Sequence, residues 1–159
     1  MAQDSVLDAV DQLTRAPELV REAIAAVAAE KLRKKPNPSV FTPLEDVWHL
    51  RDIETEGYLV RIRSILSETL PDLEDLDGDR MAIERRYNEL ELGPAIAGFA
   101  AARRESLALL QGLPAEAWMR QALFANRIID LRTLIHIMVD HDHGHLSNIR
   151  GIYVRSIAA

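Results

Sequence analysis

The chain has 159 residues, 48% hydrophobic and 28% charged, which is enough for one folded domain spanning residues 1–159. Its net charge of −6 argues against nucleic-acid binding, and a solvated helix end is the better interpretation of its one basic cluster, Lys31, Arg33, Lys34 and Lys35. Because the sequence has no cysteine, disulfides, thiolate metal ligands and cysteine nucleophiles are excluded.

The first half of the chain predicts one short helix and the first two of four main helices. The short helix is expected over Ser5–Leu13 and the first main helix from Pro17 to about Leu32, with Pro17 in its first turn. The prolines that follow disfavour a continued helix. Thr42, Pro43 and Glu45 then form a capping-box pattern, which opens a helix running to about Thr69.

The second half predicts two more long helices after a long connection. Residues from Leu70 to about Leu90 are acidic and show no clear apolar stripe. Long helices are expected from Gly93 and Pro94 to near Gly112 and from about Ile128 to Ile157, with a short helical turn over Pro114–Trp118. We find no convincing strand pattern. The fold class is therefore all-α: a four-helix bundle with a long crossover between the second and third main helices.

Four of the five histidines fall in the last helix, and helical geometry divides them into two pairs. At about 100° per residue, His145 lies near the middle of the apolar arc around Met138, and His141 lies on its edge. The arc also holds Leu131, Leu134, Ile135, Ile149, Ile152 and Tyr153. His136 and His143 point to the opposite side, where exposed histidines are expected.

Two interpretations of His141 and His145 stay open at this point. They are polar core residues bonded to separate buried partners, or they are ligands of one ion, which a spacing of one helical turn allows. Two ligands are too few for a tight site. His49 is the only remaining histidine; it borders the face of Leu50, Ile53 and Val60, with Gly57 leaving room nearby.

Four segments, taken together, resemble the DinB-like superfamily, four-helix bundle proteins that include bacterial metal-dependent thiol transferases. The resemblance extends from about Leu19 to Ile152. It rests on Phe41–Glu54 with its His-Leu-x-Asp-x-Glu core, on Tyr87 with Phe99, Arg103 and Leu107, on Trp118-Met119-Arg120, and on His141-Asp142-His143-Gly144-His145. It implies that His49, His141 and His145 bind one metal ion. The chain departs from the family at Ala125-Asn126-Arg127, where a glycine is common, although asparagine tolerates a left-handed turn.

Three neutral histidines leave an ion with open positions, as catalytic sites do. The resemblance implies a divalent ion (zinc, nickel, iron or manganese) that activates a low-molecular-weight thiol cosubstrate for transfer, or a related isomerisation or hydrolysis. Glu54 and Asp142 are candidates to orient ligand histidines. An anionic cosubstrate could meet arginines at the mouth of the site, for which the candidates are Arg51, Arg103, Arg120 and Arg127.

The alternatives are a non-catalytic metal-binding bundle in a stress response and a plain helical scaffold. The first residues show no signal-peptide pattern, and no apolar run approaches the roughly 18 residues that span a bilayer. We therefore expect a cytoplasmic protein that binds a small-molecule substrate but no nucleic acid and no membrane. Because symmetric pairs are the commonest assembly of such chains, a homodimer is the expected state.

Overall fold

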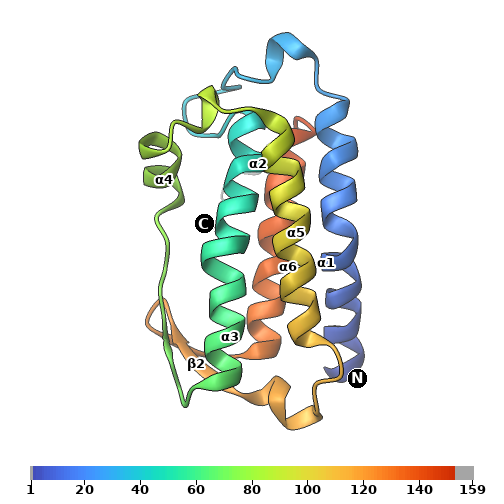
Figure 1. Ribbon diagram of the computed structural model, residues 1–159, viewed down its shortest axis with the longest axis vertical. Coiled ribbons are helices and arrows are strands. Elements are labelled where there is room, and N and C mark those ends of the chain that lie inside the picture. Colours follow the sequence, from blue (N-terminus) through green and yellow to red (C-terminus); the bar gives the residue numbers. More distant parts are fainter. Residues whose placement is uncertain (1, 153–159) are drawn as a thin grey trace.

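The computed structural model describes residues 2–152 and confirms the four-helix bundle (Figure 1). Four long helical elements lie side by side. They are α1 (Ala2–Ala25), α2 (Pro43–Asp52) with its continuation, α5 (Leu92–Leu110) and α6 (Leu131–Ile149). α2 continues through a π-helical segment, η2 (Ile53–Tyr58), into α3 (Leu59–Ser67). No helix among the described residues is both long and apolar enough to cross a membrane.

The long crossover is also present, and it determines the direction of the helices. α1 and α6 pack against each other and run one way, while α2–α3 and α5 pack against each other and run the opposite way (Figure 1). The segment between α3 and α5 travels back along the bundle. It contains β1 (Asp72–Leu73), α4 (Gly78–Glu84) and a 3₁₀ turn, η3 (Tyr87–Glu89).

The N-terminal region differs from the expectation of two helices, because α1 runs unbroken through Pro17. A proline has no N–H, so the carbonyl of Leu13, four residues earlier, lacks its helical donor. In this structure Nη1 of Arg103 donates to that carbonyl at 2.9 Å. The lost bond is therefore replaced from α5, and the helix continues. A separate 3₁₀ turn, η1 (Ala29–Lys31), follows α1.

The start of α2 is the predicted capping box. The backbone N–H of Glu45 donates to Oγ1 of Thr42 at 3.1 Å, and Oε2 of Glu45 accepts from the Thr42 N–H at 2.8 Å. Pro43 occupies the first turn, where its missing N–H costs nothing. This cap fixes the beginning of the helix that carries His49.

The π-helical segment η2 corrects one predicted orientation. Val60 was expected on the face of Leu50 and Ile53, yet it is 48% exposed, whereas Leu59 and Ile62 are buried. A π turn holds one more residue than an α turn, so it rotates every later residue around the helix axis. The sequence pattern alone assumed an uninterrupted α-helix.

The region before α6 forms a hairpin that the sequence analysis missed. After the predicted helical turn, η4 (Ala115–Met119), strands β2 (Gln121–Phe124) and β3 (Arg127–Asp130) pair antiparallel, and β1 adds in parallel to β2. Ala125 and Asn126 both have positive φ, 48° and 62°, which suits a two-residue hairpin turn. α6 therefore begins at Leu131 and not at Ile128, with Asp130 as its N-cap.

The far end of α6 is shorter than predicted. The helix ends at Ile149, Gly151 has a φ of +79°, and Ile152 is 63% exposed, so Ile152 does not belong to the core. Tyr153 lies outside the described residues. The remaining members of the predicted apolar arc are all buried, among them Leu131, Leu134, Ile135, Met138 and Ile149.

Candidate metal centre

The three predicted ligand histidines meet inside the bundle. His49 comes from α2, and His141 and His145 come from successive turns of α6; all three are buried. One ring nitrogen from each lies within 4.8 Å of the others, and Nε2 of His49 is 2.9 Å from Nε2 of His141. His136 and His143 are exposed, as the helical geometry predicted.

Hydrogen bonds within the protein do not satisfy all the ring nitrogens of the three histidines, and a shared divalent ion would bind one nitrogen of each ring. Nδ1 of His145 contacts Oδ1 of Asp46 at 2.7 Å, so Nδ1 carries the proton and Nε2 keeps a lone pair. That Nε2 is buried and has no hydrogen-bond partner. Buried polar atoms are rarely left in this state unless an ion or water satisfies them. The three histidines can therefore hold a metal ion.

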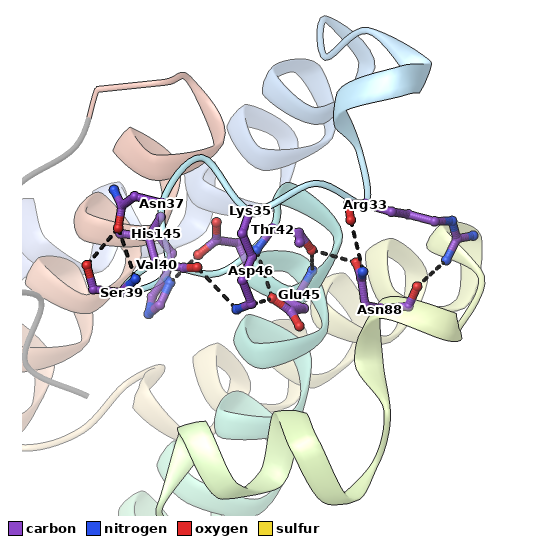
Figure 2. A network of polar contacts seen from close by, with 10 residues as sticks. All are labelled: Arg33, Lys35, Asn37, Ser39, Val40, Thr42, Glu45, Asp46, Asn88 and His145. Atoms are coloured by element: carbon purple, nitrogen blue, oxygen red, sulfur yellow. Dashed lines mark hydrogen bonds and ion pairs between the residues drawn. The ribbon is translucent and has the colours of Figure 1, made fainter.

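Asp46 is the carboxylate that contacts one of these histidines, although the sequence patterns pointed to Glu54 and Asp142. It lies on the same helix as His49, one turn earlier, and is 1% exposed. Figure 2 shows its contact with His145. Burial raises the pKa of Asp46, while its hydrogen bond with His145 opposes that rise. Such a carboxylate fixes the ring orientation and makes the histidine a stronger ligand.

Replacing Asp46 with asparagine should weaken metal binding about 10- to 100-fold, because the ring of His145 loses a charged acceptor. Competition for Zn²⁺ against a chromophoric chelator measures this loss. The matched control is Asp140→Asn, an exposed carboxylate on α6 that should leave the affinity unchanged. Equal affinities in the two variants would argue against the role of Asp46.

Glu54 and Asp142, the two carboxylates expected to orient the histidines, bind Arg103 instead. Nε and Nη2 of Arg103 donate to Glu54 at 3.0 and 2.9 Å, and Nη1 and Nη2 donate to Asp142 at 2.7 and 3.0 Å. Arg103 is 1% exposed, so it lies within the core and does not line a mouth. Burial raises the pKa of Asp142, and the guanidinium of Arg103 opposes that rise.

Of the other candidate arginines, Arg51 and Arg120 contact neighbouring side chains or the backbone, and Arg127 is exposed. Arg120 donates to the carbonyls of Ile65 and Glu68 at 2.7 Å each, and Arg127 is exposed on the hairpin. Arg51 stacks over Trp48 and donates to Oδ1 of Asp52 at 2.8 Å. A role for these three in binding an anionic cosubstrate remains a prediction.

Two aromatic side chains enclose the histidines. Phe41 lies 5.2 Å from the ring of His49 and 6.0 Å from that of His145, while Tyr58 packs edge-on against His141 at 5.5 Å. The loop that leads to Phe41 is anchored at several points: Lys35 bonds the Val40 carbonyl and Glu45, and Thr42 bonds Asn88 (Figure 2). The apolar wall around the rings is therefore held in place.

Gly78, the first residue of α4, closes the site on the side of His49. A Cβ at this position would lie 2.4 Å from Cε1 and 2.8 Å from Nδ1 of the His49 ring. The glycine is thus required for space. Asp52 helps to hold the crossover here, since Oδ2 accepts from Tyr87 at 2.7 Å and from Arg85 at 2.6 Å.

Replacing Gly78 with alanine should displace the ring of His49 and weaken Zn²⁺ binding about 10- to 100-fold, comparable to losing an orienting contact. Gly93→Ala is the matched control, because a Cβ there meets no atom within 4 Å. The same chelator competition reports both affinities. If Gly78→Ala binds Zn²⁺ as tightly as Gly93→Ala, the ring of His49 is not confined as described.

The buried histidines should also make stability depend on pH. Burial, followed by the nearby His145, lowers the pKa of His49 and His141 well below 6.5. Below pH 6.5, these two histidines bind protons in the unfolded chain but stay neutral in the folded chain. The free energy of unfolding of the metal-free protein therefore decreases as the pH falls. The loss approaches about 1.4 kcal/mol per pH unit for each such group.

Urea unfolding at pH 7.5 and 5.5 measures this dependence. His141→Asn should show a smaller loss than the unsubstituted protein, whereas His143→Asn, at an exposed position, should show the same loss. An unchanged dependence in His141→Asn would contradict the assignment.

Comparisons with known proteins identify the family. No curated protein sequence matches the chain. Among solved structures, YfiT from Bacillus subtilis, described as "a probable metal-dependent hydrolase with an unusual four-helix bundle topology", matches with a TM-score of 0.88 at 19% identity. The match covers 96% of this chain and 87% of YfiT, and it shows the shared fold. The family model for the DinB superfamily matches residues 12–149, and the chain therefore belongs to the DinB superfamily.

Proposed function

We propose that this chain is a metal-dependent enzyme that activates a low-molecular-weight thiol cosubstrate for transfer to an electrophilic small molecule. The observation that carries the proposal is the open set of ligands. Three buried histidines converge, and no fourth histidine or carboxylate joins them among the side chains that the structure describes, those of residues 5–152. Structural zinc sites are usually closed by four protein ligands, whereas catalytic sites keep a position for a reacting molecule.

A divalent ion bound here would supply Lewis acidity that lowers the pKa of a thiol or water toward neutrality. The chain has no cysteine, so the thiol has to come from a cosubstrate. In the transfer, the thiol would lose its proton to solvent, the sulfur would form a bond to the electrophilic carbon, and the leaving group would depart with its electron pair.

The chain's own residues would prepare this chemistry. Asp46 holds the ring of His145 through the 2.7 Å contact, and Gly78 leaves space for the ring of His49. Phe41 and Tyr58 cover the rings with apolar surface, which limits competing water. The low pKa of His49 and His141 keeps both imidazoles neutral, the form that binds a metal.

Hydrolysis is the second candidate, and the fold shared with YfiT favours it, because that protein is described as a probable metal-dependent hydrolase. The same open position would then take water. We also propose that the ion is zinc, nickel, iron or manganese. The protein would act on small molecules, as a homodimer in the cytoplasm.

The test uses protein purified without a histidine tag and loaded with Zn²⁺ or Ni²⁺. Conjugation of glutathione and of bacterial low-molecular-weight thiols to 1-chloro-2,4-dinitrobenzene is followed beside hydrolysis of 4-nitrophenyl acetate. We expect thiol conjugation that is lost in His145→Ala and kept in His143→Ala. Hydrolysis alone would favour the second candidate, and a metal-loaded protein that accelerates neither reaction would favour a non-catalytic metal-binding bundle.

A further inference from the structure

All three lysines of the sequence line one cavity at the end of the bundle, apart from the metal centre. The cavity has a volume of about 810 Å³ and lies between the end of α1, the loop after it and the end of α6. None of the three ligand histidines lines it. We propose that it binds a small organic anion, whose acidic head group meets the lysines and whose apolar body lies against the helices.

The charge around the cavity is the first argument. Lys31, Lys34, Lys35 and Arg150 line it against a single carboxylate, Glu22, although the whole chain carries a net charge of −6. Lys35 is engaged with Glu45 at 3.1 Å. Within the described part of the chain, neither Lys31 nor Lys34 forms an ion pair. Two ammonium groups are therefore available to an anion.

The position of these lysines is not explained by attraction to the partial negative charge at the ends of α1 and α6. The last turns of α1 and α6 carry no basic residue, and α1 ends at Ala25, well before Lys31. Each helix C-terminus contributes only about half a negative charge, and its effect fades within one turn. The positive charge at the cavity exceeds what the two helix ends would offset.

The wall of the cavity is the second argument. Its apolar part is formed by Ala23, Ala26, Val27, Pro36, Pro43 and Ile149. Apolar walls with few polar groups, in a volume of about 300–1,000 Å³, are typical of small-molecule sites. The site thus suits an anion with an apolar body.

The first experiment uses the fluorescence of 8-anilinonaphthalene-1-sulfonate, an aromatic anion, with the full chain. The double variant Lys31→Glu/Lys34→Glu should weaken its binding about tenfold, through two reversed charges. Arg63→Glu/Arg104→Glu is the matched control, since it makes the same charge change at exposed sites outside the cavity. Ala26→Phe should also weaken binding by filling the apolar part without changing charge.

The second experiment identifies the ligand class and locates it. Octanoate and octyl phosphate should displace the dye, whereas octanol, with the same chain but no charge, should not. Acylation of amines by N-hydroxysuccinimide acetate, followed by mass spectrometry, measures how fast each lysine reacts. At octanoate ten times above its dissociation constant, Lys31 and Lys34 should react about ten times more slowly, with the N-terminal amine unchanged.

Three results would overturn the proposal. If the cavity variants and the Arg63/Arg104 control weaken dye binding by the same factor, the dye adsorbs without specificity. Displacement by octanol as strong as by octanoate would remove the role of the lysines. Lysines that are already unreactive without any ligand would show that the cavity is covered in solution.

Discussion

Replacing His141 or His145 with alanine should abolish most metal binding, while His143→Ala and His136→Ala should retain it. Each of the first two variants removes one of the three histidines that converge in the described part of the chain. The loss should exceed the roughly 10- to 100-fold that follows when a contact orienting a ligand is removed. His49→Ala should behave in the same way, because its Nε2 lies 2.9 Å from that of His141.

The measurement is metal content per chain after dialysis, determined on protein purified without a histidine tag. His143 and His136 serve as internal controls, because they lie on the same helix and are exposed. Equal retention in all the variants would remove the proposed site, and loss in His143→Ala would place the ion elsewhere on α6.

Replacing Arg103 with methionine should cause the largest loss of stability of any substitution considered. Arg103 donates five hydrogen bonds, to Glu54, Asp142 and the carbonyl that Pro17 leaves free, and it is 1% exposed. Its removal leaves two buried carboxylates without a counter-charge. Breaking one partner of a buried ion pair typically costs about 3–5 kcal/mol.

Urea unfolding of metal-free protein measures this loss. Arg104→Met, at the exposed neighbouring position, should stay within about 0.5 kcal/mol. The triple variant Arg103→Met/Glu54→Met/Asp142→Leu should recover most of the stability, because replacing a whole buried ionic group with apolar side chains of similar volume is often neutral. An Arg103→Met protein as stable as Arg104→Met would show that the network contributes little.

The sequence was sufficient to predict the part of the site that depends on helical geometry. His141 and His145 turn inward and His136 and His143 turn outward, because α6 is a regular helix over all four positions. His49 was harder to place, since periodicity put it only at the border of the apolar face, and the family resemblance pointed to it.

What the sequence did not reveal depends on contacts between distant segments. Pro17 reads locally as a helix start, and only Arg103, 86 positions later, explains why α1 continues. The π segment before Val60 leaves no mark in the apolar pattern. The hairpin at Ala125-Asn126 lacks the usual glycine, so the sequence indicated only a turn there, and the second strand was interpreted as the start of the last helix.

The orienting carboxylate was missed for a related reason. Glu54 and Asp142 were expected to orient the histidines, but their side chains bind Arg103. Asp46 lies one turn before His49 on α2, yet it serves His145 on α6. The sequence places Asp46 one helical turn before His49. That spacing does not indicate that Asp46 contacts His145 on another helix.

Anomalous diffraction from crystals of the Zn²⁺-loaded protein tests the central claim most directly. We expect one strong peak per chain, at about 2.0–2.1 Å from a ring nitrogen of each of His49, His141 and His145. No peak among these three rings, or a stronger one at His136 or His143, would contradict the metal centre.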